Sequence, residues 1–141
     1  MKKYLYLICI ATALFSCSKE EAKSPDNLRL QMVDKWLYRN AKEIKYSATG
    51  VATDSAGIAA GTKDFFEFKG DGSFTNSMDN GKDITTGTFT TSTITRFMLK
   101  QGSTNYICRV INLNFDNFVF VKQEPKVAGQ PYTEIKYTLY R

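Results

Sequence analysis

The sequence contains no histidine, which removes the commonest general base and metal ligand of proteins. Nucleophile activation of the serine–histidine or cysteine–histidine kind is therefore excluded. No Gly-x-Ser-x-Gly, P-loop or Cys-x-x-Cys motif occurs among the 141 residues. The aspartates Asp71, Asp79 and Asp83 lack the spacing of an EF-hand loop, and turn formation accounts for them. We therefore expect no enzyme, no metal site and no cofactor.

Cysteine is scarce, and its three positions do not form a disulfide framework. Cys9 and Cys17 belong to the N-terminal segment, which leaves Cys108 without a partner in the rest of the chain. Cys108 lies in the apolar run Tyr-Ile-Cys-Arg-Val-Ile, a setting typical of a small core residue rather than a reactive nucleophile. The fold must therefore be stabilised by a hydrophobic core instead of disulfides.

Charge of either sign is also modest. The formal net charge is +5, and removal of residues 1–16 with Lys2 and Lys3 lowers it to +3. Lysine and arginine are scattered, with no basic stripe and no basic helix. The pattern predicts no nucleic-acid partner.

The first sixteen residues have the pattern of a secretory signal peptide. Lys2 and Lys3 precede an uncharged run over residues 4–15, which is too short to cross a bilayer as a helix. The other reading of this run is a buried N-terminal helix or strand. The order of positive residues, apolar run and the small residue Ser16 favours a signal peptide that is cut before Cys17.

The segment Leu14-Phe15-Ser16-Cys17 resembles a lipobox, the signal for bacterial lipoprotein maturation. Phe15 departs from the small or aliphatic residue that is commonest at its position. The resemblance implies a diacylglycerol on the sulfur of Cys17, and hence a membrane as partner. Each buried methylene of such a lipid contributes roughly 0.8 kcal/mol, so two or three acyl chains hold a protein on the membrane almost permanently.

The residues after Cys17 bear on the membrane that holds the chain. Ser18 stands where an aspartate would signal inner-membrane retention, so we expect an outer-membrane anchor. The run Ser18-Lys19-Glu20-Glu21 resembles the surface-export signal of some Gram-negative lipoproteins, although a solvated tether has the same composition. The periplasmic face and the cell surface both remain open.

The chain divides into a signal peptide (1–16), a lipidated tether (17–27) and one domain (28–141). Ser24 as N-cap and Pro25 in the first turn predict a short helix over residues 25–34 that plugs one end of the domain. From Trp36 onward, aromatic and β-branched residues predict strands. The predicted strands cover residues 35–46, 63–69, 73–78, 84–92, 94–101, 105–114, 117–124 and 132–140.

Eight strands joined by short turns predict an all-β fold, an antiparallel up-and-down barrel with a short N-terminal helix. Closure is the commonest way for such a meander to remove its exposed edges. Gly70 and Gly72 are expected to supply positive-φ residues for the tightest hairpin. Residues 47–62 are small and break the rhythm of strands, which predicts a long loop. That loop is either an excursion without a role or a lid over the barrel mouth.

Three further patterns lead to a family resemblance. Trp36 stands at the start of the first strand, a Phe-x-Phe-x-x-Asp-Gly-x-Phe hairpin covers residues 66–74, and the last strand ends in Tyr-Thr-Leu-Tyr. Together with Thr-Gly-Thr-Phe-Thr at 86–90, residues 28–140 resemble the lipocalin-like domains of Gram-negative lipoproteins. Asp34 departs from the glycine usual at its position. The resemblance implies that Trp36 seals the barrel base and that a late arginine, here Arg141, stacks across it.

The interior of an eight-stranded barrel holds either side chains or one small ligand. Alternation along the strands predicts six side chains that point inward. If they line a cavity, the protein binds a small apolar ligand. If they fill the interior, the chain is an interaction or accessory module that docks to a protein partner or to another copy of itself. The six candidate lining residues are Phe66, Phe68, Phe74, Phe89, Phe97 and Leu99.

Residues 105–121 are apolar on both faces of their strands. A strand with one wet face should alternate cleanly between apolar and polar residues. We therefore expect the outer face of this region to be covered, by the chain's own helix, by another subunit or by a partner protein.

Overall fold

The computed structural model describes residues 25–141. The predicted signal peptide and the predicted lipidation of Cys17 lie outside the described residues. The described elements, in chain order, are α1 (Pro25–Met32), β1 (Asp34–Tyr46), β2 (Ala52–Ile58), β3 (Phe65–Phe68), β4 (Ser73–Met78), the 3-10 turn η1 (Asp79–Gly81), β5 (Asp83–Thr93), β6 (Arg96–Gln101), β7 (Thr104–Leu113), β8 (Asn117–Gln123) and β9 (Tyr132–Tyr140).

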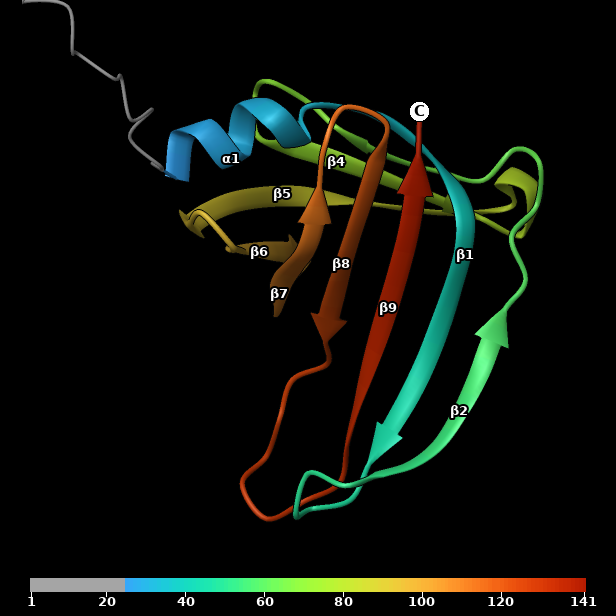
Figure 1. Cartoon of the computed structure of the whole chain (residues 1–141), viewed down its shortest axis with the longest axis vertical. Helices are drawn as coiled ribbons and strands as arrows, with labels where there is room; N and C mark the ends of the chain where they lie inside the picture. The colour runs from blue at the N-terminus through green and yellow to red at the C-terminus, as the bar shows by residue number, and fades with distance from the viewer. Residues whose placement is uncertain (1–24) are drawn as a thin grey trace, which may run out of the picture.

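Eight of the strands close into an antiparallel barrel (Figure 1). Each strand from β3 to β9 pairs with the next one along the chain, and β1 completes the ring by pairing with both β3 and β9. Short turns make these pairings local in sequence. The predicted up-and-down barrel with a short N-terminal helix is confirmed.

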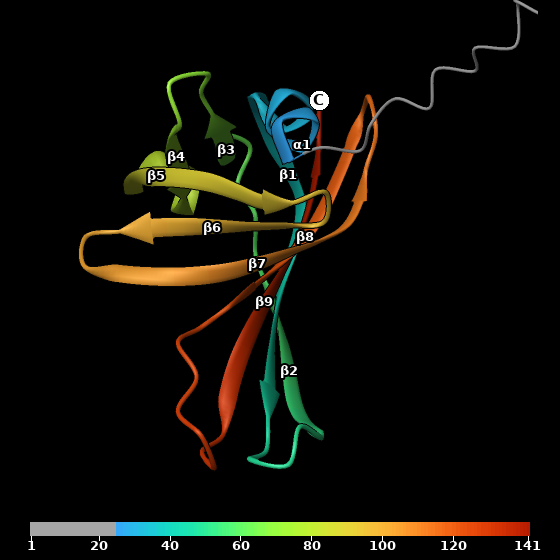
Figure 2. The same ribbon diagram turned by 90° about the vertical axis from the view of Figure 1, so that its left-hand side faces the viewer.

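The remaining strand, β2, extends the sheet beyond the closed ring. One edge of β1 pairs first with β3, over Asp34–Leu37, and then with β2, over Ala41–Tyr46. Between these two stretches, the pairing of β1 with β9 on its other edge is interrupted by a bulge near Arg39. As a result β1, β2 and part of β9 form a ribbon that runs on past the layer of β5, β6 and β7 (Figure 2).

The prediction of a loop over residues 47–62 is wrong for its centre, where β2 forms a strand. Six of the seven residues of β2 are exposed, so no apolar–polar alternation marks it in the sequence. It forms because β1 offers an open row of backbone groups, and such tertiary pairing overrides weak propensity. β2 therefore lies along the edge of β1, and the prediction of a lid over the mouth is not borne out for this segment.

The helix α1 lies across one end of the barrel, as the sequence predicts, but ends two residues early (Figures 1 and 2). Leu28 and Met32 are one helical turn apart and are both buried against the barrel. Asp34 already pairs with Phe68, so the extended pairing of β1 stops the helix. We call this the closed end of the barrel.

The hairpin between β3 and β4 depends on one glycine rather than two. Gly72 has a φ of 88°, whereas Gly70 does not adopt a positive φ. Asp71 supports the turn, since its Oδ1 accepts hydrogen bonds from the backbone N–H (2.8 Å) and the hydroxyl (2.7 Å) of Ser73. These bonds lower the pKa of the Asp71 carboxyl.

Gly87 is required for a different reason, namely the close approach of β5 to its neighbours. A Cβ at this position would lie 2.1 Å from the carbonyl oxygen of Lys100 and 2.7 Å from a ring carbon of Phe74. Gly87→Ala should therefore lower the free energy of unfolding by roughly 1–3 kcal/mol, because the strand must shift to make room. Gly57→Ala is the matched control, since a Cβ there meets nothing within 4 Å. Equal midpoints for the two variants in chemical denaturation would contradict the packing described.

The outer face of β7 is more exposed than the sequence predicts. Ile107 is 59% exposed and Ile111 is 48% exposed. The expectation that the chain's own helix covers this face is wrong, because α1 packs mainly on β5 at the closed end. Cover by another subunit or a partner protein remains a prediction.

Candidate binding site

The six candidate lining residues all point into the barrel. They come from four consecutive strands, and each is at most 3% exposed. Phe66 and Phe68 lie on β3, Phe74 on β4, Phe89 on β5, and Phe97 and Leu99 on β6. The prediction that alternation along these strands directs them to a common core is therefore confirmed.

The rings of this set contact one another and the opposite wall of the barrel. The Phe68 ring centroid lies 5.1 Å from that of Phe89 and 5.8 Å from that of Phe118 on β8. Phe97 reaches Phe120 on β8 at 5.3 Å. Such spacings are those of edge-to-face and tilted aromatic pairs in van der Waals contact. Side chains from β3 thus meet those of β8 across the barrel, and Phe97 packs beside them, so that rings occupy the axis.

Two tyrosines bring polar groups into this aromatic core. Tyr38 on β1 and Tyr137 on β9 are buried, and their rings lie 5.8 Å apart. The Tyr38 hydroxyl donates a hydrogen bond of 2.5 Å to Oδ1 of Asn76. Burial raises the pKa of both hydroxyls, so both remain protonated at neutral pH. The sequence alone did not predict that these two tyrosines are buried, because tyrosines at the exposed positions of a strand follow the same alternation.

The end of the barrel away from α1 carries charge on its inner face. The register places Lys122 beside Cys108 and Ile135, on the side that faces the axis. The Lys122 Nζ lies 3.0 Å from a carboxylate oxygen of Glu124 and 4.4 Å from the ring centroid of Tyr106. An ion pair and a cation–π contact therefore satisfy this half-buried cation within the protein.

Cys108 is fully buried in the core, in agreement with the prediction of a structural thiol. Burial raises its pKa well above the ordinary value, so the reactive thiolate is not formed at neutral pH. We expect iodoacetamide to leave Cys108 unmodified in the folded protein at pH 7 and to alkylate it after unfolding in guanidinium. Intact mass measures both states. Stoichiometric alkylation of the folded protein would contradict this placement.

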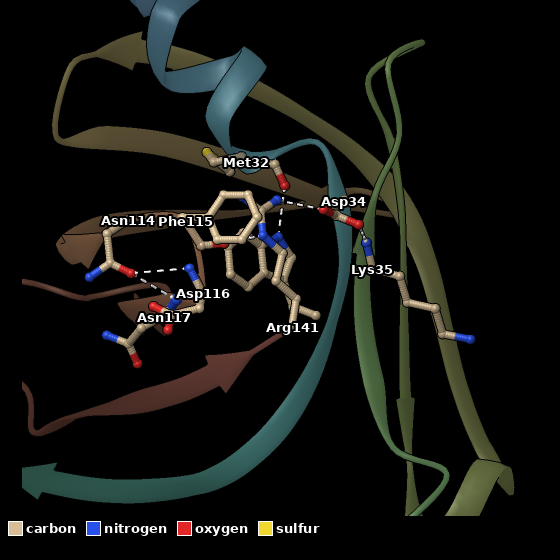
Figure 3. Close-up of polar contacts among 9 residues, drawn as sticks. Met32, Asp34, Lys35, Asn114, Phe115, Asp116, Asn117 and Arg141 are labelled. Carbon is tan, nitrogen blue, oxygen red and sulfur yellow. Dashed lines mark hydrogen bonds and ion pairs between the residues drawn. The ribbon is translucent and has the colours of Figure 1, made fainter.

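The closed end is sealed by Trp36 and Arg141. Trp36 is fully buried and its Nε1–H donates a 2.9 Å hydrogen bond to the carbonyl oxygen of Met32. The Arg141 guanidinium lies 4.6 Å from the Trp36 ring and pairs with Asp34 at 2.5 Å (Figure 3). The arginine stack that the family resemblance implied is therefore present. Asp34, at the position where the family usually has glycine, supplies the carboxylate that holds the arginine in place.

A cavity of about 320 Å³ lies outside the barrel interior, between α1 and the strand ends at the closed end. Leu28, Val110 and Leu113 give it apolar walls, and Asn27 and Gln31 of the helix contribute polar groups. Gln31 donates a hydrogen bond of 2.9 Å to Asn27 across one helical turn. The volume is at the lower limit of small-molecule sites. Its other lining residues are Ile94, Thr95, Ile111 and Asn112.

Among residues 25–141, no group of three histidine, cysteine, aspartate or glutamate side chains is placed to hold a metal ion. In the same part of the chain, no helix is long and apolar enough to cross a membrane.

Comparison with solved structures finds lipocalins. A deswapped triple mutant of bovine odorant-binding protein is 10% identical, with 79% of this chain and 74% of that chain covered at a TM-score of 0.47. Aphrodisin, a sex pheromone from female hamster, is 13% identical, with 78% and 74% covered at a TM-score of 0.42. No protein-family model matches the chain, and no curated protein sequence matches it.

Proposed function

We propose that this chain is a lipid-anchored envelope protein without catalytic activity, whose filled barrel acts through its outer surface as an interaction or accessory module. The observation that carries this proposal is the meeting of Phe66 and Phe68 on β3 with Phe120 and Phe118 on β8 across the barrel interior. A ligand inside the barrel would have to separate these rings, at the cost of the contacts they make. Binding through the surface requires no such rearrangement.

The surface has features that suit this role. Ile107 and Ile111 expose large apolar side chains on β7, next to Arg109 and Arg96. β2 adds an exposed strand whose only partner among the described residues is β1. Apolar side chains beside charged ones, and a strand with an open edge, are both common in protein interfaces. The occupant of the surface is a protein partner or a second copy of the chain.

The second candidate function is the binding of a small apolar ligand, and the closed-end cavity favours it. Its volume of about 320 Å³ would take a small molecule without any movement of the core rings. The six candidate lining residues would surround a ligand inside the barrel only if their rings moved apart. Carrier function would therefore place the ligand either beside α1 or in a barrel that opens.

Titration with the apolar fluorescent dye N-phenyl-1-naphthylamine separates the two functions. A filled barrel predicts no saturable dye binding by the unaltered chain. Phe97→Ala, which removes one ring from the core, should instead gain binding of benzene, a probe of the size of the missing ring. Val110→Trp fills the closed-end cavity and serves as the second variant. Saturable 1:1 binding that persists in Val110→Trp would overturn the filled barrel. Binding that is lost in Val110→Trp would place the ligand beside α1 and favour the second candidate function.

A further inference from the structure

Large apolar side chains protrude from the closed end of the barrel. Phe115, in the turn between β7 and β8, is 83% exposed, and Leu30 on α1 is 76% exposed; these are the highest values for large apolar residues in the described chain. Leu30 lies on the face of α1 opposite Leu28 and Met32, so it points away from the barrel. Ile94 and Ile111 are also exposed, beside the closed-end cavity.

The turn that carries Phe115 is held in a fixed shape. The Asn114 side-chain oxygen accepts hydrogen bonds from the backbone N–H groups of Asp116 (3.3 Å) and Asn117 (2.9 Å). Arg141 donates a hydrogen bond to the carbonyl oxygen of Phe115, and its guanidinium lies 4.8 Å from the ring (Figure 3). The protein therefore displays this aromatic ring on an ordered support, although nothing in the described chain buries it.

The same end of the barrel is where the chain leads toward Cys17. Only residues 17–24 separate the proposed lipid from Pro25, the first residue of α1. A chain of this length reaches at most about 28 Å when fully extended. This step rests on the proposed function, in which Cys17 carries the lipid. The lipid then holds the closed end next to the bilayer.

We propose that the closed end docks onto the bilayer surface, with Phe115 and Leu30 inserted among the lipid headgroups and upper acyl chains. Two apolar side chains alone would bind a membrane weakly, but the tether makes the contact intramolecular and raises its effective concentration. Four of the ten large apolar side chains that are exposed among the described residues, Leu30, Ile94, Ile111 and Phe115, lie around this end. The bilayer is a partner that the tether brings within reach.

Docking in this way orients the rest of the molecule. The β1–β2 and β8–β9 connections lie at the opposite end, next to the ribbon of β1, β2 and β9 (Figures 1 and 2). Val51 belongs to the first of these connections and Val127 to the second. The ribbon would then project away from the membrane, where a partner can reach the exposed edge of β2. Membrane contact and contact through the edge of β2 would use opposite ends of one small barrel.

Environment-sensitive labels at both ends test the docking. The full chain is purified from membranes, reconstituted into phosphatidylethanolamine–phosphatidylglycerol vesicles, and labelled with a nitrobenzoxadiazole (NBD) group at Leu30→Cys or Phe115→Cys. Val51→Cys and Val127→Cys are matched controls, being exposed apolar positions at the far end. Cys108 is buried and does not compete for the label. In a parallel arm, a chain that begins with six histidines followed by Ser18, and so lacks Cys9 and Cys17, is attached to nickel-chelating lipid, so that docking is measured without lipidation.

We expect the labels at positions 30 and 115 to shift to shorter emission wavelengths and to lose most of their emission when the bilayer contains a lipid-linked quencher. The labels at 51 and 127 should keep the properties of a label in water. Water-like signals at all four positions on nickel-chelating lipid would overturn the docking. Failure of the unaltered chain to float with vesicles would refute the lipid anchor alone. Burial of positions 30 and 115 without vesicles would assign this end to a second copy and overturn the proposal.

Discussion

Replacing Phe68 by alanine should lower the free energy of unfolding by about 3–5 kcal/mol. Phe68 is 1% exposed and its ring lies within 6 Å of the rings of Phe66, Phe89 and Phe97, and of Phe118 from the opposite wall. Removing it deletes contacts to both sides of the barrel at once and leaves a cavity that a closed sheet cannot collapse to fill. Equilibrium denaturation followed by circular dichroism measures the effect.

Phe115→Ala is the control for this substitution, because the same chemical change is made where the ring is 83% exposed. Its cost should stay within about 1 kcal/mol, since a surface ring has little burial to lose. If the two variants had the same unfolding midpoint, the aromatic rings could not be packed across the barrel axis as described.

Cys17→Ala should release the chain from membranes or leave it as an unprocessed precursor. The proposed anchor consists of acyl chains on this sulfur, and each methylene withdrawn from water contributes roughly 0.8 kcal/mol. The two side chains proposed to dock at the closed end cannot replace so much apolar surface. Membrane fractionation and intact mass measure the two consequences, namely where the chain is found and whether residues 1–16 are removed.

Cys108→Ala is the matched control for the anchor, because it removes the thiol that is buried in the barrel. This variant should remain in the membrane fraction with the mass of a processed and acylated chain. Unchanged fractionation and unchanged mass for Cys17→Ala would show that the lipobox resemblance is misleading and that the chain is held, if at all, by other means.

The strands that sequence reasoning found are those with one buried face. Phe66 and Phe68 on β3, and Phe118 and Phe120 on β8, alternate with less buried neighbours, and this alternation is readable in one sequence. β2 escaped because it is exposed on both faces and contains only small and polar residues before Ile58. Its existence depends on an open edge of β1, which no local pattern reveals.

For the candidate site, alternation predicted which side chains turn inward but not whether they leave room for a ligand. That outcome depends on contacts across the axis, such as Phe66 with Phe120, which the pairing of several intervening strands determines. The seal at the closed end was predictable only through the family resemblance. Arg141 and Asp34 are 107 residues apart in the sequence, and closure of the barrel brings them together.

The most direct test of a filled, surface-acting barrel is native mass spectrometry of the chain extracted from the membranes of its own host. We expect the mass of a chain that begins at Cys17 and carries its acyl groups, alone or with protein partners. A small molecule that is reproducibly bound to the native chain and released on denaturation would contradict the account.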